Sequence, residues 1–259
     1  MILTLDIGNT TVGVSGVEVR GANYRVLFGG KISSQAGEAE CRDALKSLLD
    51  GNGVSAEDVE GIALSSVVPR LEGTVSGAAE ALLGMRPVRI DAASAAGGLR
   101  FAIPHPERLG LDRIADAAWA ARQYALPAVT ADLGTATTFN VLGEGGVFLG
   151  GVIACGVETG VGALAERTAQ LPRLTLGPPA ALIGRDTEAC MLSGAVYGAA
   201  ALIDGIAGRV EAELGKAVTL ILTGGWSKLA APLCTHPHVW EPDLLPKGLA
   251  LLYTLHDAQ

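Results

Sequence analysis

Aromatic residues and positive charge are both scarce in this chain. Only 4% of the 259 residues are aromatic, and 19 Lys and Arg stand against 27 Asp and Glu, for a net charge of −8. The sequence contains no run of Lys and Arg, which argues against a nucleic-acid-binding surface. Because basic side chains are few, we expect an anionic ligand to be held by backbone N–H groups and a metal ion.

Cysteine is sparse as well, and no Cys-x-x-Cys pair or His at zinc-ligand spacing accompanies it. We therefore expect reduced, buried thiols of a cytoplasmic protein, without a zinc site, at Cys41, Cys155, Cys190 and Cys234. The first residues, MILTLDIGNT, lack the basic segment and long apolar stretch of a signal peptide or membrane anchor. The apolar run 195–203 is too short to span a bilayer and is followed by Asp204, so we expect no membrane contact.

Apolar residues and glycine are abundant. About half of the chain (49%) is hydrophobic and 35 residues are glycine, enough for a large core and for two domains of roughly 100–150 residues. Hydrophobic spacing predicts two strands around Gly8-Asn9, further strands over 26–33, 61–68, 87–91, 128–132, 137–142, 146–153 and 219–223, and helices over 40–49, 71–83, 111–124, 161–170, 187–214 and 245–256. This order predicts an α/β protein with mixed sheets.

The sequence contains an internal repeat. LDIGNTT, which includes Asp6, resembles ADLGTATT, which includes Asp132, about half a chain later. Each segment follows an apolar strand, reads Asp-apolar-Gly-polar and continues into a β-branched strand. Two such copies predict a duplicated domain with a ligand cleft between the halves.

Both turns suit phosphate binding. A tight turn with Gly and small hydroxyl residues points several donors toward one place, and an aspartate at the strand end can hold a cation or a metal-bound water. The structural alternative is a pair of hairpins in which Gly8-Asn9 supplies a positive φ. That alternative leaves the shared Asp and the Thr-rich continuations, Thr10-Thr11 and Thr137-Thr138, unexplained.

Other nucleotide-binding signatures are absent or weak. No GxxxxGK[ST] occurs, which excludes a P-loop. The glycines of Thr223-Gly224-Gly225, directly after a predicted strand, allow the backbone to lie flat beside a base or ribose. A plain turn explains them equally well.

Taken together, these motifs resemble those of the type III pantothenate kinases, members of the acetate-kinase, heat-shock-70 and actin superfamily. The resemblance runs nearly end to end through DIGNT, SSVVP, PERLGLDR, DLGTATT, GGVI, TAQLP, IGRDT, CMLSG, TGG and PDLLPKGL. It implies two ribonuclease-H-like domains of the actin-like ATPase fold, with mixed sheets flanked by helices and an ATP cleft between them. We place the domains at 1–112 and 113–259, with a boundary near residue 112 and a C-terminal helix that can pack back on the first domain.

The resemblance also implies a reaction: transfer of the γ-phosphoryl group of ATP to the primary hydroxyl of pantothenate, the first committed step toward coenzyme A. ATP would come with Mg²⁺ and a monovalent cation, K⁺ or NH₄⁺. Asp112 would be the general base and Arg113 would hold substrate, which fits the chemistry of a carboxylate and a guanidinium. From the residues alone, a helix cap is the favoured interpretation of Asp112, and both roles can coexist.

The remaining implied roles fall into three sets. Pantothenate contacts are expected at Gly110, Leu111, Asp112, Arg113, Thr187 and the position of Ile103. ATP contacts are expected at Asp6, Ile7, Gly8, Asn9, Thr10, Thr11, Val12, Gly13, Thr135, Gly224 and Gly225. Asp132 would bind the monovalent cation, and Asp6 would bind Mg²⁺ through water.

Four features depart from the family pattern. Ile103 stands where a substrate-contacting tyrosine is common, and Cys155 replaces a proline. His105 stands at a usual Asn, and Arg185-Asp186 replace a usual Lys-Asn pair. Because these departures concern pantothenate recognition, two alternatives stay open: a superfamily kinase or phosphohydrolase for another hydroxyl substrate, and a non-catalytic nucleotide-binding regulator.

Small residues are concentrated in the predicted helix 187–214, at Ser193-Gly194-Ala195 and Gly198-Ala199-Ala200-Ala201. A helix that is apolar on more than one side requires a partner on each. We therefore expect a homodimer, which the resemblance also implies. The alternative is a helix buried within its own domain.

Overall fold

The structure is a computed structural model that describes residues 1–90 and 99–257. The chain forms two compact units. Unit 1 comprises residues 1–100, 104–122 and 243–259, and unit 2 comprises residues 101–103 and 123–242. The helix that starts at residue 111 therefore belongs to unit 1, and the division follows that helix instead of preceding it.

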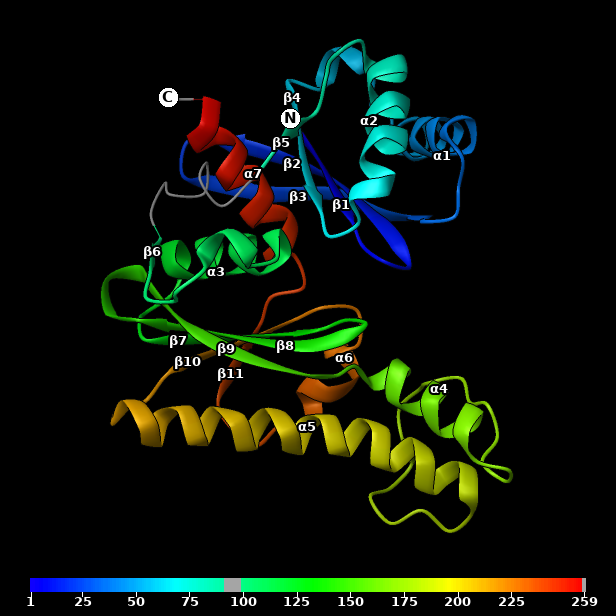
Figure 1. Ribbon diagram of the computed structural model, residues 1–259, viewed down its shortest axis with the longest axis vertical. Coiled ribbons are helices and arrows are strands. Elements are labelled where there is room, and N and C mark those ends of the chain that lie inside the picture. Colours follow the sequence, from blue (N-terminus) through cyan, green and yellow to red (C-terminus); the bar gives the residue numbers. More distant parts are fainter. Residues whose placement is uncertain (91–98, 258–259) are drawn as a thin grey trace. The chain divides into compact units, whose positions relative to one another are not determined.

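Unit 1 contains a five-stranded mixed sheet of order β3-β2-β1-β4-β5 (Figure 1). Strands β1, β2 and β3 are antiparallel, whereas β4 and β5 run parallel to β1. Of the predicted strand 87–91, only two residues form β5, and Asp91 lies outside the described residues. The strands span Ile2–Ile7 (β1), Thr11–Arg20 (β2), Asn23–Ser33 (β3), Gly61–Ser66 (β4) and Val88–Arg89 (β5).

Helices cover both faces of the unit 1 sheet. Side chains of β1 and β4, such as Leu5 and Leu64, share a core with Leu45 of α1 and Val75 of α2. The alternate residues of these strands are buried too, and α7 contacts β1, β2, β3 and β4. The helices are α1 (Glu38–Gly51), α2 (Pro69–Leu83), α3 (Leu111–Gln123) and α7 (Leu244–Asp257).

Close approaches fix α7 in unit 1. A Cβ at Gly248 would collide with the Ala115 carbonyl of α3, and one at Gly61 would collide with the Tyr253 hydroxyl. Because both positions are glycine, α7 can lie directly on α3 and on β4. The C-terminal helix thus completes the N-terminal unit.

Unit 2 repeats the arrangement. Its sheet has the order β11-β10-β7-β8-β9-β6, in which β7, β8 and β9 are antiparallel and β10 and β11 are parallel to β7 (Figure 1). The strands are β6 (Arg100–Phe101), β7 (Ala128–Leu133), β8 (Ala136–Gly143), β9 (Val147–Cys155), β10 (Thr219–Thr223) and β11 (His238–Trp240). Apart from β6, this is the topology of unit 1, as expected for a duplicated domain.

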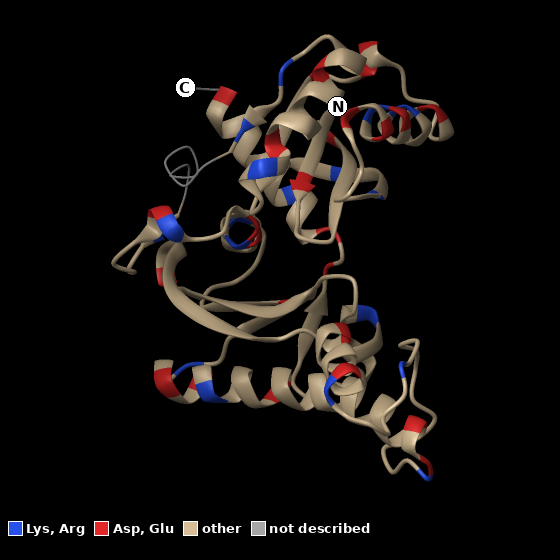
Figure 2. Ribbon diagram, turned by 45° about the vertical axis from the view of Figure 1, so that its right-hand side comes forward, with Lys and Arg blue, Asp and Glu red and all other residues tan. Residues whose placement is uncertain are grey.

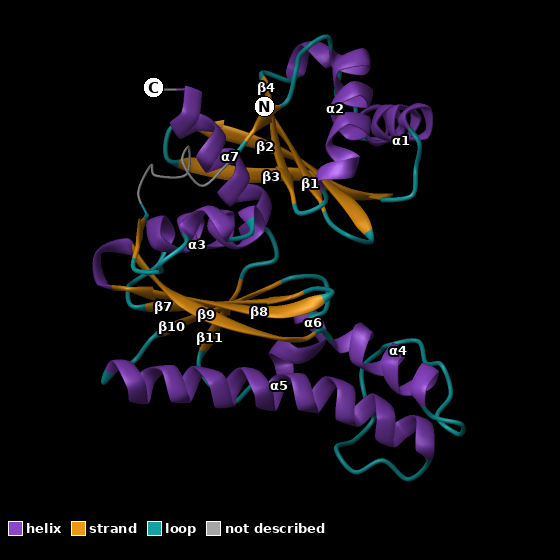
Figure 3. Cartoon of the chain, viewed as in Figure 1, coloured by secondary structure: helices purple, strands orange, loops and turns teal. Residues whose placement is uncertain are grey.

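Three helices complete unit 2, α4 (Val157–Arg167), α5 (Thr187–Leu214) and α6 (Ser227–Ala230), and α5 lies along the sheet (Figure 3). Ile203 and Ala207 of α5 share a core with Val129 and Leu220 of the sheet. Short 3₁₀ turns occupy Ala56–Asp58, Pro106–Arg108, Glu144–Gly146 and Ala231–Leu233.

Among the described residues, α5 is the one helix long and apolar enough, by length and composition alone, to cross a membrane. Its Met191, Val196, Ile203 and Ala207 form a buried stripe, and Asp204 accepts hydrogen bonds from the loop before β11. A buried stripe and an engaged carboxylate fit a helix that packs on a sheet.

The thiols differ from the expectation of burial. All four are free, but only Cys41 is buried, and Cys234 is intermediate. Cys155 and Cys190 are exposed, because they lie at the end of β9 and in the first turns of α5, where both line a groove between α4 and α5. The prediction of four buried thiols was therefore wrong for these two.

Candidate functional site

The first glycine turn joins β1 to β2. Asp6 is half-buried near the end of β1, and the Gly8 N–H donates to the Thr11 carbonyl over 3.0 Å. β1 and β2 form the antiparallel hairpin of the structural alternative, but neither Gly8 nor Asn9 has the positive φ that this alternative assigned to them. Gly8 allows a close approach, since a Cβ there would lie 3.1 Å from the Thr11 carbonyl oxygen.

The rest of this turn is exposed but braced. The Ser34 hydroxyl donates to the Asn9 carbonyl over 2.8 Å, and the Ser34 N–H donates to the Thr10 carbonyl. Asn9 and Thr10 keep their own side chains at the surface, whereas Val12 points into the core. The turn thus presents amide and hydroxyl groups from a fixed backbone.

The end of β4 links this turn to the start of α3. The Val67 N–H donates to the Ile7 carbonyl over 3.1 Å, and a Cβ at Gly110 would lie 3.9 Å from Val67 Cγ1. The first glycine turn and the Gly110–Arg113 segment therefore both adjoin the end of β4, although about a hundred residues separate them in sequence. The structure brings these two sets of predicted residues together within unit 1.

Asp112 lies in the first turn of α3. Its Oδ1 accepts the Arg113 N–H over 2.8 Å, which satisfies one of the unpaired donors of the helix start. A Cβ at Gly110 would collide with this Oδ1, so the glycine leaves room for the carboxylate. Asp112 is the second residue of α3, so it accepts an N–H of the helix start without being the N-cap that the sequence suggested, and the other oxygen, Oδ2, is not the acceptor in that bond.

Arg113 is half-buried beside two carboxylates. Burial lowers the pKa of the guanidinium, and the charges of Asp112 and Asp116 oppose that shift. Asp116, one turn along α3, is only 1% exposed. The sequence reading did not single out Asp116, whose i+3 spacing from Arg113 was the available signal.

Ser65 is a second residue that the sequence reading passed over. It pairs in register with Asp6 across parallel strands, so the two side chains share one face of the sheet. Ser65 is fully buried, and its hydroxyl has no hydrogen-bond partner among the described residues. A polar pair at adjacent strand ends is a place for a water or a ligand atom.

The second glycine turn, in unit 2, is built like the first. Asp132 is half-buried near the end of β7, and the Gly134 N–H donates to the Ala136 carbonyl over 3.0 Å. The start of α4 packs against this turn, because a Cβ at Gly156 would collide with the Thr135 carbonyl, which accepts the Thr159 hydroxyl over 2.7 Å. The Gly156 N-cap of α4 has no side-chain cap, so the first-turn N–H groups of α4 face the neighbourhood of Thr135.

The Thr223-Gly224-Gly225 segment lies against the second turn. Gly224 has a φ of +88°, and a Cβ there would collide with Asp132 Oδ1 and the Leu133 nitrogen. Only glycine fits both the conformation and the space. The reading of these glycines as a plain turn is therefore incomplete, because one of them also adjoins the strand-end carboxylate.

Thr187 and Ile103 also lie in unit 2. Thr187 is the exposed first residue of α5, whose N-cap Asp186 accepts the Ala189 N–H over 2.8 Å. Ile103 is half-buried, and a Cβ at Gly150 of β9 would lie 4.0 Å from it. Leu111, by contrast, is a buried core residue of α3 and offers only its backbone to a ligand.

A cation site here would depend on few protein ligands. The described residues contain no group of three or more His, Cys, Asp or Glu that could hold a metal ion. The carboxylate of Asp132, enclosed by Gly224, and that of Asp6 beside Ser65 are oxygen donors, which suit Mg²⁺ and K⁺. The residues fit cations that keep several waters or share phosphate oxygens.

Comparisons with known proteins agree with this arrangement. Residues 2–209 match the family model described as type III pantothenate kinase. Proteins described as type III pantothenate kinase are similar over nearly the whole chain: that of Thermomicrobium roseum is 37% identical, covering 98% of this chain and 96% of the relative, and that of Dehalococcoides mccartyi is 32% identical, covering 99% and 98%. That of Thermus thermophilus is 37% identical, covering 98% of both chains.

Solved structures support the fold. A conserved putative Baf family transcriptional activator from Campylobacter jejuni aligns with a TM-score of 0.55 at 18% identity, covering 99% of this chain and 100% of that one. The activator of 2-hydroxyisocaproyl-CoA dehydratase from Clostridium difficile, with bound ADPNP, aligns with a TM-score of 0.53 at 14% identity, covering 99% and 95%. The fold is the actin-like ATPase fold that the resemblance implied.

Strand-end aspartates on duplicated glycine turns, a Gly-Leu-Asp-Arg helix start and matches over nearly the whole length thus lead to one family. The chain belongs to the type III pantothenate kinases, the phosphotransferases that phosphorylate pantothenate in coenzyme A biosynthesis.

Proposed function

We propose that Asp112 is the general base of this kinase, in the formation of 4′-phosphopantothenate from pantothenate and ATP. The pantothenate hydroxyl oxygen attacks the γ-phosphorus, its proton passes to the Asp112 carboxylate, and the bond to the ADP oxygen breaks. The observation that carries the assignment is the position of Gly110, where an added Cβ would lie 3.9 Å from Val67 Cγ1, together with the hydrogen bond from the Val67 N–H to the Ile7 carbonyl. That arrangement supports a carboxylate within reach of the Asp6–Gly13 phosphate turn.

Arg113 supplies the charge for substrate binding. A guanidinium can pair with the pantothenate carboxylate through two parallel hydrogen bonds. The carboxylates of Asp112 and Asp116 beside it keep it charged despite its burial. In this proposal Thr187 adds a hydroxyl to the pantothenate site, and Ile103 replaces a tyrosine hydrogen bond with an apolar contact.

Phosphate binding rests on backbone groups. The turns at 6–13 and 132–137, with Gly224 and Gly225, offer N–H groups, and the uncapped start of α4 adds a helix N-terminus close to Thr135. Asp132 would hold a monovalent cation, K⁺ or NH₄⁺, and Asp6 would hold Mg²⁺ through water. When bound, these cations neutralise phosphate charge, which a chain with a net charge of −8 cannot do with lysine.

The proposal extends to assembly and location: a cytoplasmic homodimer that pairs through α5. One stripe of α5 packs on its own sheet, while Gly194, Gly198 and Gly208 have nothing within 4 Å of a built Cβ. Figure 2 shows most of α5 without charged residues. An open face of small, uncharged residues supports close approach of a second helix.

The test is an ADP-release assay with ATP, Mg²⁺ and K⁺. Release that depends on pantothenate is the expected result. Release without pantothenate would point to a phosphohydrolase, and release only with another alcohol would point to a kinase for that alcohol, which Ile103 and Cys155 favour. ATP binding without release would point to a regulator.

A further inference from the structure

The side chain of Ser65 points to the face of the unit 1 sheet that α7 covers. Side chains alternate along a strand, so Gly61 and Ser65 of β4 share one face, and Ile62 and Leu64 share the other. Ile62 and Leu64 belong to the core with α1 and α2, whereas a Cβ at Gly61 would collide with the Tyr253 hydroxyl of α7. Ser65 is therefore turned away from that core and toward the side on which α7 lies.

Two neighbours on this face connect Ser65 with the first glycine turn and with the start of α3. Its register partner on β1 is Asp6, whose side chain lies on the same face. The strand pairing continues past Ser65, because the Val67 N–H donates to the Ile7 carbonyl over 3.1 Å. Val67 therefore lies on the face of Ser65 as well, and an added Cβ at Gly110 would lie 3.9 Å from Val67 Cγ1.

The Ser65 hydroxyl is enclosed and unpaired. Ser65 is 0% exposed, and among the described residues its hydroxyl is the one buried hydroxyl without a hydrogen-bond partner. Thr4, on the same face of β1, shows the usual case, because its buried hydroxyl donates to the Ser15 carbonyl over 3.2 Å. Since buried polar groups are nearly always paired, an unpaired one requires an explanation.

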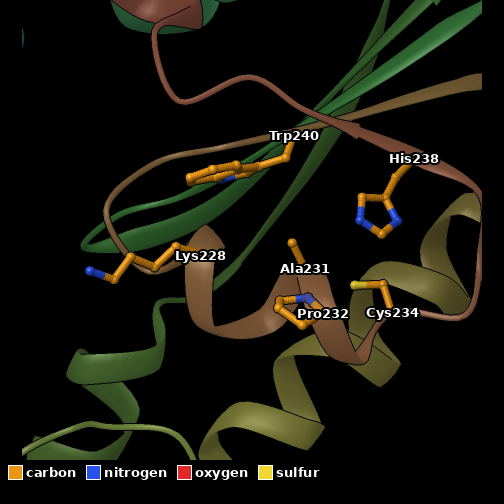
Figure 4. A pocket seen from close by; sticks show the side chains of 6 residues that line it. All are labelled: Lys228, Ala231, Pro232, Cys234, His238 and Trp240. Atoms are coloured by element: carbon orange, nitrogen blue, oxygen red, sulfur yellow. The ribbon is translucent and has the colours of Figure 1, made fainter.

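Even polar groups beside an open hollow of this protein have partners. The hollow, of about 440 Å³, adjoins β11 in unit 2, and Figure 4 shows the rings of Trp240 and His238 at its edge. The Trp240 Nε1 donates to the Ser227 hydroxyl over 3.0 Å, and His238 Nδ1 lies 2.9 Å from the His236 carbonyl. The unpaired hydroxyl of Ser65, at a fully enclosed position, is the exception among these groups.

The Asp6 carboxylate can supply the missing acceptor. Neighbouring strands lie about 4.8 Å apart, so a turn of the Ser65 side chain to another staggered rotamer brings its hydroxyl within reach of a carboxylate on the register partner. An ionised carboxylate only accepts, and it has room for about four hydrogen bonds, so Asp6 can take the Ser65 donor in addition to its other contacts.

We propose that Ser65 is a positioning residue that acts through Asp6. Its hydroxyl turns to donate to the Asp6 carboxylate when nucleotide and Mg²⁺ bind, and it holds that carboxylate toward a water of the hydrated Mg²⁺. The proposal rests on the proposed role of Asp6 and adds the residue that orients it. Because the Ser65 hydroxyl is unpaired in the structure, the bond to Asp6 replaces no other bond of Ser65 and adds to the affinity.

The primary test measures ADP binding by titration calorimetry, once with Mg²⁺ and once with EDTA in its place. The Mg²⁺ effect is the ratio of these two affinities. In Ser65→Ala it should be smaller by about tenfold, the size expected for one hydrogen bond to a charged group, and the affinity in EDTA should change little. Asp6→Asn should remove the Mg²⁺ effect.

Thermal unfolding separates this role from a structural one. Ser65→Ala should keep or raise Tm, because it removes a buried hydroxyl that has no partner among the described residues. Thr4→Val is the matched control, a near-isosteric change of a buried hydroxyl on the same face of the sheet. It should lower Tm, because the Ser15 carbonyl loses its donor, and it should leave the Mg²⁺ effect unchanged.

An unchanged Mg²⁺ effect in folded Ser65→Ala overturns the role of Ser65, and an effect that is lost in Asp6→Asn would then leave the role of Asp6 in place. Equal losses of affinity with Mg²⁺ and with EDTA, together with a lower Tm, would assign Ser65 to the stability of the sheet and also overturn the proposal. Since none of these measurements needs turnover, a chain that shows the expected Mg²⁺ effects but releases no ADP from ATP with pantothenate would contradict the proposed function alone.

Discussion

At the scale of single residues, the side chain of Asp112 combines one observed contact with one proposed role. Its Oδ1 stabilises the first turn of α3 by accepting the Arg113 N–H. The proposed base function needs a carboxylate that can take a proton. An amide keeps the first property and removes the second, so one substitution separates them.

Asp112→Asn should lower kcat by about 10² to 10⁴, the usual cost of losing a general base. The melting temperature should change little, because the Asn amide oxygen still accepts the Arg113 N–H and Asn caps helices as well as Asp does. Steady-state kinetics and thermal unfolding of the same preparation check both. A near-normal kcat would leave Asp112 as a cap only.

Asp132 supports a second residue-scale prediction. Asp132→Asn should weaken the binding of ADP and flatten the response of turnover to K⁺, because the neutral amide cannot offset the charge of a cation. The KM for pantothenate should stay close to the wild-type value. Calorimetry with ADP and a K⁺ titration of the rate measure these effects, and full affinity with normal K⁺ activation would contradict the cation role.

At the scale of elements, an ion-pair cluster fastens the loop before β11 to the C-terminal half of α5. His236 Nε2 lies 3.2 Å from Glu211 Oε1, and His236 Nδ1 lies 2.9 Å from the Pro237 carbonyl. Both ring nitrogens face acceptors, so the protonated imidazole fits best. Asp204 accepts the N–H groups of Thr235 and His236 in the same cluster.

This cluster predicts a stability profile with pH. Burial acts to lower the pKa of His236, but the bonds to Pro237 and Glu211, with the Asp204 charge, raise it overall. A raised folded-state pKa means that the stabilisation is complete below the unfolded value of about 6.5 and is lost as pH rises through the folded value. The free energy of unfolding should therefore fall as the pH rises above about 6.5.

His236→Gln should remove that fall and lower stability mainly at acidic pH. Urea unfolding at several pH values between about 5 and 8 measures it, with His256, an exposed residue of α7, replaced as the matched control. The carboxylate side has the opposite sign. A hydrogen bond from the Val218 N–H lowers the pKa of Glu211, so its contribution is present above about pH 4.5 and is lost on acidification. A profile identical in wild type and His236→Gln would show that the pair adds nothing.

Elements with a strong periodic pattern could be predicted from the sequence. The helix 187–214 and the strand 219–223 have the predicted bounds, because Asp186 caps the helix, Gly215 ends it in the left-handed conformation, and β-branched and leucine residues fill the strand. The predicted helix 161–170 lies instead at α4, Val157–Arg167, since Gly156 is its cap.

Short elements could not be predicted. β6 and β11 have two and three residues, too few for any periodicity, and α6 has four. The segment His236-Pro237-His238 illustrates this limit, because His238 begins β11 and the His236 side chain is only 16% exposed. The orientation of Trp240 could not be predicted for the same reason, because it depends on strand pairing with Leu222 and on the hydrogen bond to Ser227.

The two glycine turns could be predicted from the sequence, because their pattern occurs twice in the chain and such a repeat is visible without a structure. Ser65 and Asp116 were not found, since each acquires its meaning from a neighbour on another strand or one helical turn away. The catalytic and binding roles of the site residues named in the sequence analysis stay predictions.

At the scale of the whole molecule, the open face of α5 makes the oligomeric state testable. Light scattering should give about twice the chain mass of 26.3 kDa. Gly198→Glu should shift the protein toward the monomer, because it places a charged side chain on an exposed position of the small-residue face. Gly51→Glu, at an exposed position of α1, is the matched control. A wild-type monomer with full activity would end the dimer proposal.

The position of α7 determines the order in which the two units can finish folding during synthesis. A ribosome releases the strands of unit 1 first, but Gly61, Tyr24 and Ala115 contact Tyr253, Thr254 and Gly248, which emerge after all of unit 2. During synthesis the sheet of unit 1 therefore keeps one face uncovered until α7 is made. Unit 2, which is complete before α7, can fold first. A chain truncated after residue 242 should resist protease in unit 2 and be cut in unit 1, so that the half of this kinase made first is the last to mature.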